Sequence, residues 1–561
     1  MNIYSFNQKT FPVFLGFWAS KFNSLIINRL CLIFWIIGCP SVNLGMYVRQ
    51  KKNKSGVISV QIIDKSKGNY EVVKTIGSSQ DPQEITGLVN EGKVYISKYM
   101  GQIDFNFEEL QEKALFDLFF KGIKELRLIG PELLLGKMFD EIGFNKIKDD
   151  LFRQLVISRL SHPVSKLKTT DYIYKHKGEV IDVERIYRYM DKLYNSQKEL
   201  VQDISYAHSV KVLNESIQVV FYDVTTLYFE IETPDELRKT GFSKEGRHQN
   251  PQILLGLLVS KDGYPLAYQI FEGDKYEGHT MLPVIKGFMK RYKLEKLIAV
   301  ADSGLLNQAN IEQLEAEGYE YILGARIKNT KQYVQEKILS NRPTHGQCLE
   351  IFINQIDKID QADKKVRLIY SYSDKRAYRD QQNREKGLRK LEKSLKNGKL
   401  SKSHINNRGY NKYLTMEGDL TLAIDYDKYE KDSQWDGLKG YITNTTLSKD
   451  IVIEQYGDLW KIEKAFRVSK SDLRIRPIFH RLQRRIEAHI CISFCAYKIY
   501  KELERQLKVK KLDWSPEQVI DITNSIFAIT VEMPYSKTQE TKLHLPNKEQ
   551  RDLWEVFGLN F

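Results

Sequence analysis

At 561 residues the chain is long enough for about three or four domains of ordinary size, and its 42% hydrophobic content excludes global disorder. Lys and Arg outnumber Asp and Glu by 86 to 72, which gives a net charge of +14. Such an excess favours a polyanionic partner, either nucleic acid or an anionic membrane surface, and charge alone does not choose between them.

The five cysteines show neither a metal-binding nor a disulfide pattern. No two of them form a CxxC pair, and none lies beside histidines at zinc-finger spacing. We therefore expect a reducing cytoplasm, with neither a disulfide framework nor a structural zinc. Cys491 and Cys495 are four residues apart in a helical pattern, which favours small core side chains over a metal site.

The first 45 residues differ in composition from the rest of the chain. Their second apolar run, Leu30–Cys39, is ten residues long and so too short to span a bilayer, and Arg29 interrupts any longer stretch. We interpret residues 1–45 as an extension of doubtful status, with the functional chain beginning near Met46 after a misassigned start codon. A membrane anchor is the less favoured alternative, and no membrane partner is expected.

Two segments of different pattern precede residue 215. From Tyr47 to about Tyr99 apolar and polar residues alternate, which predicts a small antiparallel sheet in a β domain of residues 46–106. Residues 107–214 space their apolar side chains three and four apart, as in helices, and form a predicted helical DNA-binding region. Its basic residues are either a solvated face or a DNA-contacting surface. They are Arg153, Arg159, Lys166, Lys168, Arg185 and Arg188.

A strand-rich block follows. "IQVVFY", which ends at Tyr222, predicts a buried strand, and "ILLGLLVSKDGYPLAYQIFEG" predicts a hairpin that turns at residues 261–263. A helix capped by Thr280 leads to a second buried strand that ends at Asp302, followed by a helix and another strand. This order suits a mixed sheet flanked by helices, an α/β (α+β) fold.

Residues 329–436 are predicted to form a β-rich basic insertion. Lys and Arg are in strong excess over residues 375–412, and "REKGLRKLEKSLKNGKL" within them predicts a surface helix. A charge run is ordinarily a solvated face, but an excess this large favours phosphate, so we expect the insertion to contact DNA. Two long helices are predicted after it, over residues 450–472 and 477–507.

Two aspartates follow the predicted buried strands. Asp223 comes directly after the first strand, and Asp302 stands at the end of the second. Carboxylates at the ends of neighbouring buried strands converge on one edge of a sheet. Each residue alone is also explained as a turn-forming Asp after a strand.

Glu463 lies in a helical segment, "YGDLWKIEKAFRVSK". The packing face of this helix carries Leu459, Ile462 and Phe466. Seven residues make almost two helical turns, so Tyr456, Glu463 and Lys470 form one stripe beside that face. A carboxylate so close to a buried face needs a partner. It is either ion-paired with Lys470 or Arg467 or part of a functional site.

Three converging carboxylates are suited to hold two divalent metal ions. Mg²⁺ prefers hard oxygen ligands, and two ions about 3.5 to 4 Å apart activate the attacking oxygen and stabilise the leaving oxygen at phosphorus. Asp223, Asp302 and Glu463 would then be both the catalytic and the metal-binding residues. No nucleophilic side chain is required, since water or a DNA 3′-hydroxyl attacks.

At these residues the sequence resembles the DDE transposases of bacterial insertion sequences, in the subgroup with a Tyr-x2-Arg-x3-Glu-x6-Lys signature. Tyr456, Glu463 and Lys470 match that spacing, and Trp460 precedes "KIE" as is common in the group. Leu459 stands at the Arg position, a departure that leaves another basic residue to supply the contact. "FYDVTTLYFE" resembles the family's first-Asp strand and "ADSG" its second.

The resemblance, which covers roughly residues 47–507, implies an RNase H-like catalytic core. Residues 215–328 and 437–510 would form this core, and residues 511–561 would be a C-terminal region. The implied function is cleavage of transposon ends and strand transfer to target DNA with two Mg²⁺ ions, which Mn²⁺ can replace. The implied partner is double-stranded DNA with terminal inverted repeats, bound by a homodimer in a synaptic complex.

The resemblance also implies roles in DNA binding. Tyr456 and Lys470 would contact phosphates near the cut, with Lys461, Arg467 and Trp460 beside them. A flipped base would need an aromatic platform, for which Trp435 and Tyr441 are candidates, although each is equally explained as a core residue. Two other functions remain open. One is an RNase H-like nuclease that cuts without joining, and the other is an inactive DNA-binding regulator.

Overall fold

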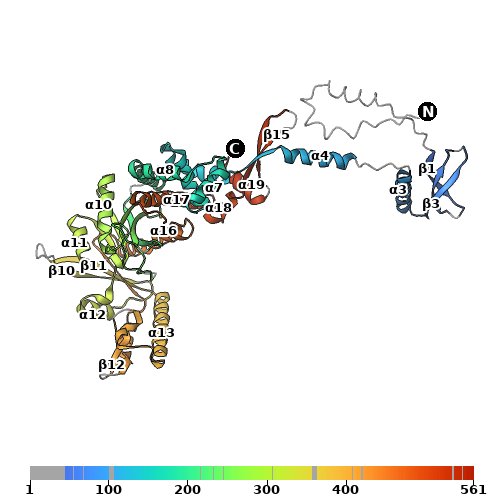
Figure 1. Cartoon of the computed structure of the whole chain (residues 1–561). Coiled ribbons are helices and arrows are strands. Elements are labelled where there is room, and N and C mark those ends of the chain that lie inside the picture. Colours follow the sequence, from blue (N-terminus) through green and yellow to red (C-terminus); the bar gives the residue numbers. More distant parts are fainter. Residues whose placement is uncertain are drawn as a thin grey trace. The chain divides into compact units, whose positions relative to one another are not determined.

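The computed structural model describes residues 45–54, 56–66, 68–99, 107–214, 217–231, 233–243, 246–305, 308–356, 363–406, 409–417, 421–533, 536–545 and 547–560. Apart from Gly45, the predicted N-terminal extension lies outside the described residues. The chain divides into two compact units, residues 1–120 and 121–561 (Figure 1).

The first unit contains a three-stranded antiparallel sheet, β1 (Met46–Lys52), β2 (Ile58–Asp64) and β3 (Glu71–Ser79), with β2 in the middle. Helix α3 (Pro82–Tyr99) packs on this sheet. The prediction that the sheet continues to about Tyr99 is therefore wrong for residues 82–99. A helix begins there because the Asp81 carboxylate accepts a hydrogen bond from the Gln83 amide at 2.9 Å, and proline suits the first helical turn.

In the second unit, four helices that precede the central sheet in the sequence pack against one long helix, α17 (Gln483–Val509). They are α5 (Gly130–Ile142), α6 (Asp150–Ser161), α8 (Val183–Ser196) and α9 (Lys198–Leu213), and α7 (Lys166–Lys177) packs on α6 and α8. Helices α6, α7 and α8 begin at Asp149, Ser165 and Asp182, whose side chains accept backbone hydrogen bonds as N-caps. Cys491 and Cys495 are buried in this core, as the sequence predicts.

One strand interrupts the region predicted to be wholly helical. After α4 (Phe107–Gly122), strand β4 (Ile123–Leu128) pairs with β15 (Phe527–Glu532), which in turn pairs with β16 (Gln539–His544). Helices α18 (Pro516–Thr523) and α19 (Lys548–Phe557) complete this C-terminal part. The local pattern did not indicate β4 because its partner lies far along the chain.

An eight-stranded mixed sheet forms the centre of the second unit, in the order β10-β11-β14-β9-β8-β5-β6-β7. Its strands are β5 (Val219–Tyr228), β6 (Gln252–Ser260), β7 (Pro265–Glu272), β8 (Ile298–Ala301), β9 (Glu320–Ala325), β10 (Cys348–Ile356), β11 (Asp363–Tyr372) and β14 (Leu438–Thr443). Strands β5, β6 and β7 are antiparallel neighbours, whereas β5, β8 and β9 run parallel. An antiparallel hairpin unit whose first strand is followed by parallel neighbours is the RNase H-like arrangement, and the predicted fold class is confirmed.

The side chains of β5 alternate between two cores, as the pleat of a strand requires. Phe221 faces the core that contains α15 (Lys449–Gly457), α16 (Trp460–Ser471) and α17. Tyr222 faces the opposite core, with α10 (Met281–Tyr292) and α11 (Gln308–Ala316). The helix predicted over residues 450–472 is thus divided into α15 and α16.

Among the described residues, none of the helices combines the length and apolar character needed to cross a bilayer.

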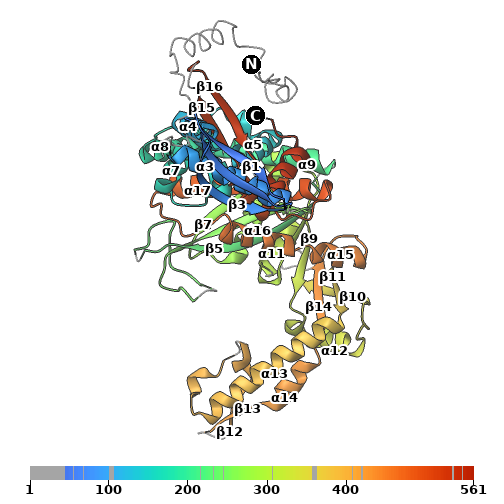
Figure 2. The ribbon, with the colours of Figure 1, turned by 90° about the vertical axis from the view of Figure 1, so that its right-hand side faces the viewer.

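The insertion, residues 329–436, has more helix than the β-rich prediction. Strands β10 and β11 extend the central sheet, and the basic run forms helix α13 (Asp374–Lys396), as predicted. The other elements are α12 (Gln332–Ser340), α14 (Tyr426–Ser433) and the hairpin β12 (Leu414–Glu417) with β13 (Thr421–Ile424). Figure 2 shows α13 and α14 beyond the β10–β11–β14 end of the sheet.

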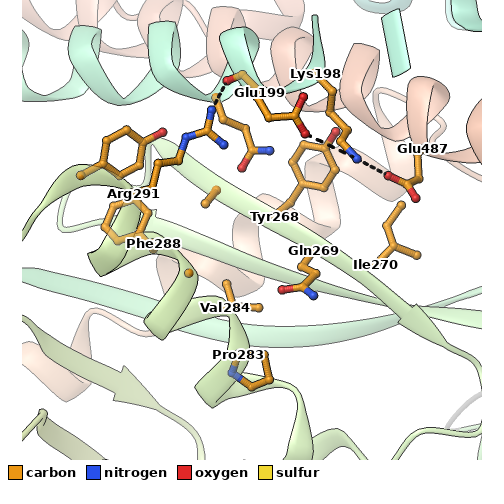
Figure 3. Close-up of a pocket in the computed structure, with 14 residues that line it drawn as sticks. Lys198, Glu199, Tyr268, Gln269, Ile270, Pro283, Val284, Phe288, Arg291 and Glu487 are labelled. Atoms are coloured by element: carbon orange, nitrogen blue, oxygen red, sulfur yellow. Dashed lines mark hydrogen bonds and ion pairs between the residues drawn. The ribbon is translucent and has the colours of Figure 1, made fainter. Parts of the chain in front are cut away.

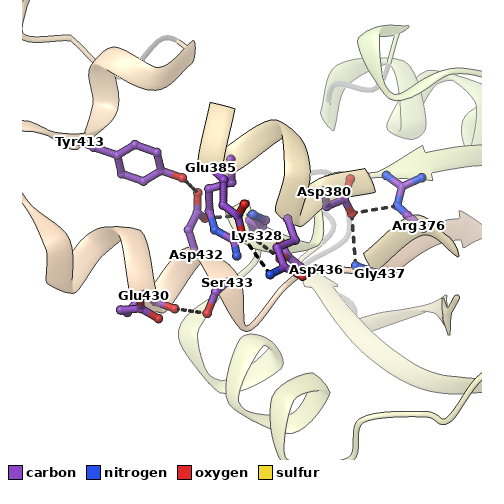
Figure 4. Close-up of polar contacts among 12 residues, drawn as sticks. Lys328, Arg376, Asp380, Glu385, Tyr413, Glu430, Asp432, Ser433, Asp436 and Gly437 are labelled. Atoms are coloured by element: carbon purple, nitrogen blue, oxygen red, sulfur yellow. Dashed lines mark hydrogen bonds and ion pairs between the residues drawn. The ribbon is translucent and has the colours of Figure 1, made fainter. Parts of the chain in front are cut away.

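Polar contacts fix the base of this insertion (Figure 4). The Asp432 carboxylate accepts hydrogen bonds from Lys328 Nζ at 2.9 Å, from the Tyr413 hydroxyl at 2.6 Å and from Lys412. Burial alone would raise the pKa of Asp432, but these three donors outweigh burial and lower it. Because Lys328 precedes the insertion and Asp432 lies near its end, the contact joins the two points where the insertion leaves and re-enters the core.

Candidate active site

The first two predicted carboxylates lie on neighbouring parallel strands. Tyr222 of β5 is in register with Ala301 of β8, so the next residues along, Asp223 and Asp302, continue that register at one edge of the sheet. Asp302 follows β8 directly, as predicted. The prediction that Asp223 follows its strand is wrong, because β5 continues to Tyr228 and Asp223 lies inside it. Its side chain is on the same face as Phe221, which is the face covered by α16.

The third carboxylate, Glu463, lies in the first turn of α16. The predicted packing face of this segment is confirmed, since Leu459, Ile462 and Phe466 are buried. Helix α16 packs through that face against β5 and β6, and Glu463 is exposed beside it. The same strand and helix therefore bring Asp223 and Glu463 to one side of the sheet.

Tyr456 and Lys439 lie close to two of the predicted carboxylates, Asp302 and Glu463. The Tyr456 hydroxyl donates a hydrogen bond to Asp302 Oδ1 at 2.8 Å, and Lys439 Nζ lies 4.3 Å from the centre of the Tyr456 ring. Burial is the largest influence on Lys439 and lowers its pKa, whereas the charges of Asp302 and Glu463 raise it. A positive charge therefore lies within electrostatic reach of both carboxylates.

The hydroxyl of Tyr456 remains a proton donor at neutral pH. Burial, and then the negative charge of Asp302, raise its pKa well above the usual range. Tyr456 is buried, and its ring packs edge-on against Tyr441 with the ring centres 4.9 Å apart. In this structure the hydroxyl that was predicted to contact a DNA phosphate is bonded to Asp302.

Lys439 was not predicted from the sequence. It is the one charged residue in the strand "LKGYIT", in which all the other residues are buried. A lone charge inside an otherwise buried strand is the signal that could have identified it, because such a charge needs a compensating partner. Arg376, in the first turn of α13, also acts on this group, since its charge lowers the pKa of Lys439. The basic insertion thus reaches the candidate site electrostatically.

The remaining predicted site residues have different environments. Lys461 forms an ion pair with Asp458 at 2.9 Å, and Trp460 is 52% exposed at the start of α16. Arg467 is exposed, and Lys470 lies in the last turn of the same helix. Trp435 and Tyr441, the candidate base-stacking residues, are only 8% and 4% exposed and belong to the core. Leu459 is buried as well, so the position of the signature Arg belongs to the packing face.

The donor set has the right chemistry for a hard divalent cation, because it consists of carboxylates and already attracts one cation, Lys439. Over the described part of the chain, however, no three His, Cys, Asp or Glu side chains are grouped closely enough to hold a metal ion. The structure therefore gathers Asp223, Asp302 and Glu463 around one edge without closing them into a ligand set.

A separate cavity of about 380 Å³ lies between α9, β7, α10 and α17 (Figure 3). Both of its basic lining residues, Lys198 and Arg291, have acidic partners. Lys198 pairs with Glu487 at 2.6 Å, and Arg291 donates to the Glu199 carbonyl at 2.6 Å and pairs with Asp203 at 2.7 Å. None of the three predicted carboxylates lines it. This cavity is therefore not the predicted catalytic site.

Comparison with known proteins gives one match to a family. A family profile described as a transposase DDE domain matches residues 215–499, which is 285 of 561 residues and just over half of the chain. No protein of curated function matches the chain. The matched residues contain all three carboxylates, Tyr456 and Lys439.

Solved transposase structures show distant similarity. The piggyBac transposase, in a synaptic complex with hairpin DNA, is 9% identical over 71% of this chain and 79% of its own, with a TM-score of 0.34. The Mos1 transposase, in a paired-end complex with the left transposon end, is 14% identical over 33% of this chain and 56% of its own, with a TM-score of 0.14. A Mos1 paired-end complex with Mn is 8% identical over 31% and 58%, with a TM-score of 0.14. These TM-scores are too low to support an argument about function. The assignment to a family therefore depends on the family profile alone.

Proposed function

The chain belongs to the family of transposase DDE domains and functions in DNA transposition, and from this premise we propose that Asp223, Asp302 and Glu463 are its catalytic residues. The observation that carries the proposal is the register of β5 with β8, which brings two carboxylates from distant parts of the sequence to one edge. Helix α16 adds the third on the same face. The reaction would be cleavage at transposon ends followed by strand transfer to target DNA.

We propose that the three carboxylates hold divalent metal, Mg²⁺ or Mn²⁺, when DNA is bound. The resemblance to DDE transposases implies divalent metal ions, and such ions activate the attacking oxygen and stabilise the leaving oxygen at phosphorus. The chemistry of three hard oxygen ligands supports this assignment. Lys439 supplies positive charge beside Asp302 and Glu463, which reduces the mutual repulsion of the carboxylates before metal binds.

Tyr456 positions the second carboxylate. Its hydroxyl donates a hydrogen bond to Asp302 Oδ1, and this bond fixes the orientation of the carboxylate. Tyr456 does not contact the other oxygen, Oδ2, which is proposed to face the metal. Four residues of α16 are proposed to contact DNA beside this edge. They are the exposed Arg467, the half-exposed Trp460, Lys461 and Lys470. The burial of Trp435 and Tyr441 favours their alternative assignment as core residues. The active assembly is proposed to be a homodimer that pairs two transposon ends.

The test uses DNA fragments that contain the sequences flanking the coding region, incubated with the full chain and Mg²⁺ or Mn²⁺. Asp223→Asn, Asp302→Asn and Glu463→Gln should each reduce cleavage and strand transfer by about 10³-fold or more, because each removes a charge needed at the reacting phosphorus. Glu454→Gln, an exposed carboxylate on α15, is the matched control and should leave both activities unchanged.

Strand-transfer products separate transposition from cutting alone. A fragment with a recessed 3′-hydroxyl end should become joined to target DNA by the unmodified chain, whereas a nuclease without joining activity would give only shortened fragments. Full cleavage by Asp223→Asn would disprove the active-site assignment. Retained DNA binding by the three inactive variants, measured by gel shift, would show that the loss is chemical.

A further inference from the structure

A second cavity in the same unit is strongly basic. It has a volume of about 420 Å³ and lies where α6, α7 and α8 meet the segment between α16 and α17. Its lining Lys, Arg and His residues are Arg159, Lys166, Lys168, Arg474, Arg476, His480 and His489. None of the described residues that line it is acidic. We call it the basic cavity.

Two cations of the basic cavity are deeply buried. Arg159 is 4% exposed and Lys166 is 5% exposed. Arg159 Nε is buried without a hydrogen-bond partner, and neither a hydrogen bond nor an acidic group is among the influences on the pKa of Arg159 or Lys166 in the described part of the chain. Burial lowers the pKa of Arg159 to about 10, and burial followed by the charge of Arg159 lowers the pKa of Lys166. The charge of Arg159 thus disfavours the charged form of Lys166.

The histidines of the cavity add to this imbalance. Burial lowers the pKa of both His480 and His489, and the charges of Arg159 and Lys166 lower these pKa values further. A buried cation without a partner is costly, and proteins ordinarily pair it or bind an anion to it. The lining is therefore complementary to a negatively charged group, which none of its described residues supplies.

Other buried cations of the same unit have partners. Lys498, which is fully buried, donates to the Ser205 carbonyl at 2.9 Å and to Ser209 Oγ at 2.5 Å. Arg238 pairs with Asp235 at 2.6 Å. The cavity in Figure 3 follows the same rule, since Lys198 lies beside the Glu487 carboxylate. Arg159 and Lys166 thus differ from these three described cations, each of which has a partner.

The position of the basic cavity connects it to the catalytic edge. Arg476 lines the cavity, and its guanidinium lies 4.9 Å from the centre of the Tyr228 ring, at the end of β5. Arg247 lies 4.1 Å from the same ring. Tyr228 is five residues beyond Asp223 on that strand, which corresponds to about 16 Å along it. A DNA strand bound at the carboxylates can therefore continue past Tyr228 toward the cavity.

The first turn of α7 provides further donors. Lys166 is the first residue of α7 after the N-cap Ser165, and both line the cavity. Backbone N–H groups and the positive end of a helix dipole favour phosphate there. Leu167 and Phe479, 63% and 71% exposed, also line the cavity and provide apolar surface for a sugar. Phosphate, rather than a single carboxylate, matches a site with several converging cations.

We propose that the basic cavity binds a phosphate group of the DNA substrate, with Arg159 and Lys166 as its principal ligands. This inference rests on the proposed function, because it takes DNA as the source of the phosphate. The anion neutralises both cations, and DNA binding thereby stabilises the helical region formed by α6, α7 and α8.

The first test is thermal unfolding of the full chain in a buffer free of phosphate, with and without inorganic phosphate at constant ionic strength. Phosphate should raise the melting temperature of the unmodified chain by several degrees and have no effect on Lys166→Met or Arg159→Met. Lys177→Met is the control, because Lys177 lies on the same helix but pairs with Asp150 and does not line the cavity. It should keep the response to phosphate.

The same variants distinguish an anion site from a structural role. Without phosphate, Lys166→Met should melt at or above the temperature of the unmodified chain, since the variant removes an unpaired buried charge. If Lys166→Met and Arg159→Met both melt well below it, the two cations are needed for folding and the inference is wrong. Arg159→Lys, which keeps a charge at that position, should retain part of the phosphate response.

The second test measures DNA affinity as a function of salt concentration. Lys166→Met should weaken binding of a transposon-end duplex about tenfold and reduce the salt dependence by about one phosphate contact, whereas Lys177→Met should do neither. Unchanged affinity and salt dependence for Lys166→Met, with normal loss of cleavage for Asp223→Asn, would overturn this inference alone. A phosphate response combined with unchanged DNA binding would likewise overturn DNA as the source. Failure of the unmodified chain to bind DNA would instead refute the proposed function.

Discussion

Two groups of buried charge, both in contact with α17, are treated in opposite ways by the fold. On one side of the helix, Lys464 and Lys501 both donate to the carboxylate of Glu504. On another, the basic cavity places Arg159 and Lys166 together, and its described lining residues include no carboxylate. In the first group a carboxylate compensates the lysine charges within the protein, whereas in the second no carboxylate among the described lining residues does so.

The difference separates charges that maintain the fold from charges that serve a partner. Burying a charge costs several kcal/mol unless it is paired, so an internal pair removes a cost, and an unpaired cation keeps that cost until a ligand arrives. The carboxylate edge is intermediate, because Asp302 is bonded to Tyr456 and lies near Lys439 but is itself exposed. The three regions therefore differ in how far their charges are paired within the protein. We expect the effect of a mutation on stability to follow that degree of pairing.

The largest effect on stability is expected in the compensated group. Glu504→Gln removes the only acidic partner of Lys501 given by the ion pairs of the described residues, and Lys501 is 9% exposed. We expect the free energy of unfolding to fall by about 3 kcal/mol, because a buried charge is left unpaired. Urea unfolding followed by circular dichroism measures this change. The comparison would break if Glu504→Gln were no more destabilising than Glu454→Gln, whose carboxylate is exposed.

The pH dependence of stability should sharpen the comparison at the basic cavity. Burial, and then the charges of Lys166, Arg485 and Arg159, lower the pKa of His480 to about 3, below the usual value of about 6.5. Below pH 6.5 the unfolded chain binds this proton and the folded chain does not, so stability is lost as the pH falls from 6.5 toward 3.

The size of this effect is measurable with one variant. Between pH 6.5 and pH 5 the His480 contribution should amount to about 1 to 2 kcal/mol of unfolding free energy, and His480→Gln should lose it. The experiment compares urea midpoints of the two proteins at a series of pH values. Inorganic phosphate should reduce the difference, because an anion in the cavity favours the protonated histidine. Identical pH profiles would show that His480 is not held neutral.

Much of the catalytic core could be predicted from local sequence. The alternation and apolar runs of β5, β6 and β8 depend on neighbouring residues, and the hairpin turn at Gly263 has the positive φ of 80° that glycine permits. The end of β5 was misplaced because Asp is unfavourable inside strands. The strand nevertheless continues, since later residues such as Leu227 are buried in the core.

The features that could not be predicted from the sequence depend on contacts between distant segments. Strand β4 exists because β15 pairs with it, and the contact of Tyr456 with Asp302 depends on the packing of α15 beneath β8 and β9. The spacing of Tyr456, Glu463 and Lys470 predicted a functional stripe but did not indicate that Lys439 from β14 would lie close to it. The sequence pattern also could not decide whether Trp435 and Tyr441 stack on a DNA base or pack in the core, because an aromatic side chain suits both roles.

The smallest expected effect lies at the intermediate region, in Tyr456→Phe. Loss of one hydroxyl should change the free energy of unfolding by about 1 kcal/mol or less, because water can replace the donor at the exposed Asp302. If Tyr456 positions Asp302, the variant should need several-fold more Mg²⁺ for half-maximal cleavage while its affinity for DNA stays the same. If the hydroxyl instead contacts a DNA phosphate, the metal requirement should stay the same and the DNA dissociation constant should rise. Cleavage titrations with Mg²⁺, run beside gel shifts of the same duplex, separate the two roles, and the structure favours the first because the hydroxyl already has a carboxylate acceptor.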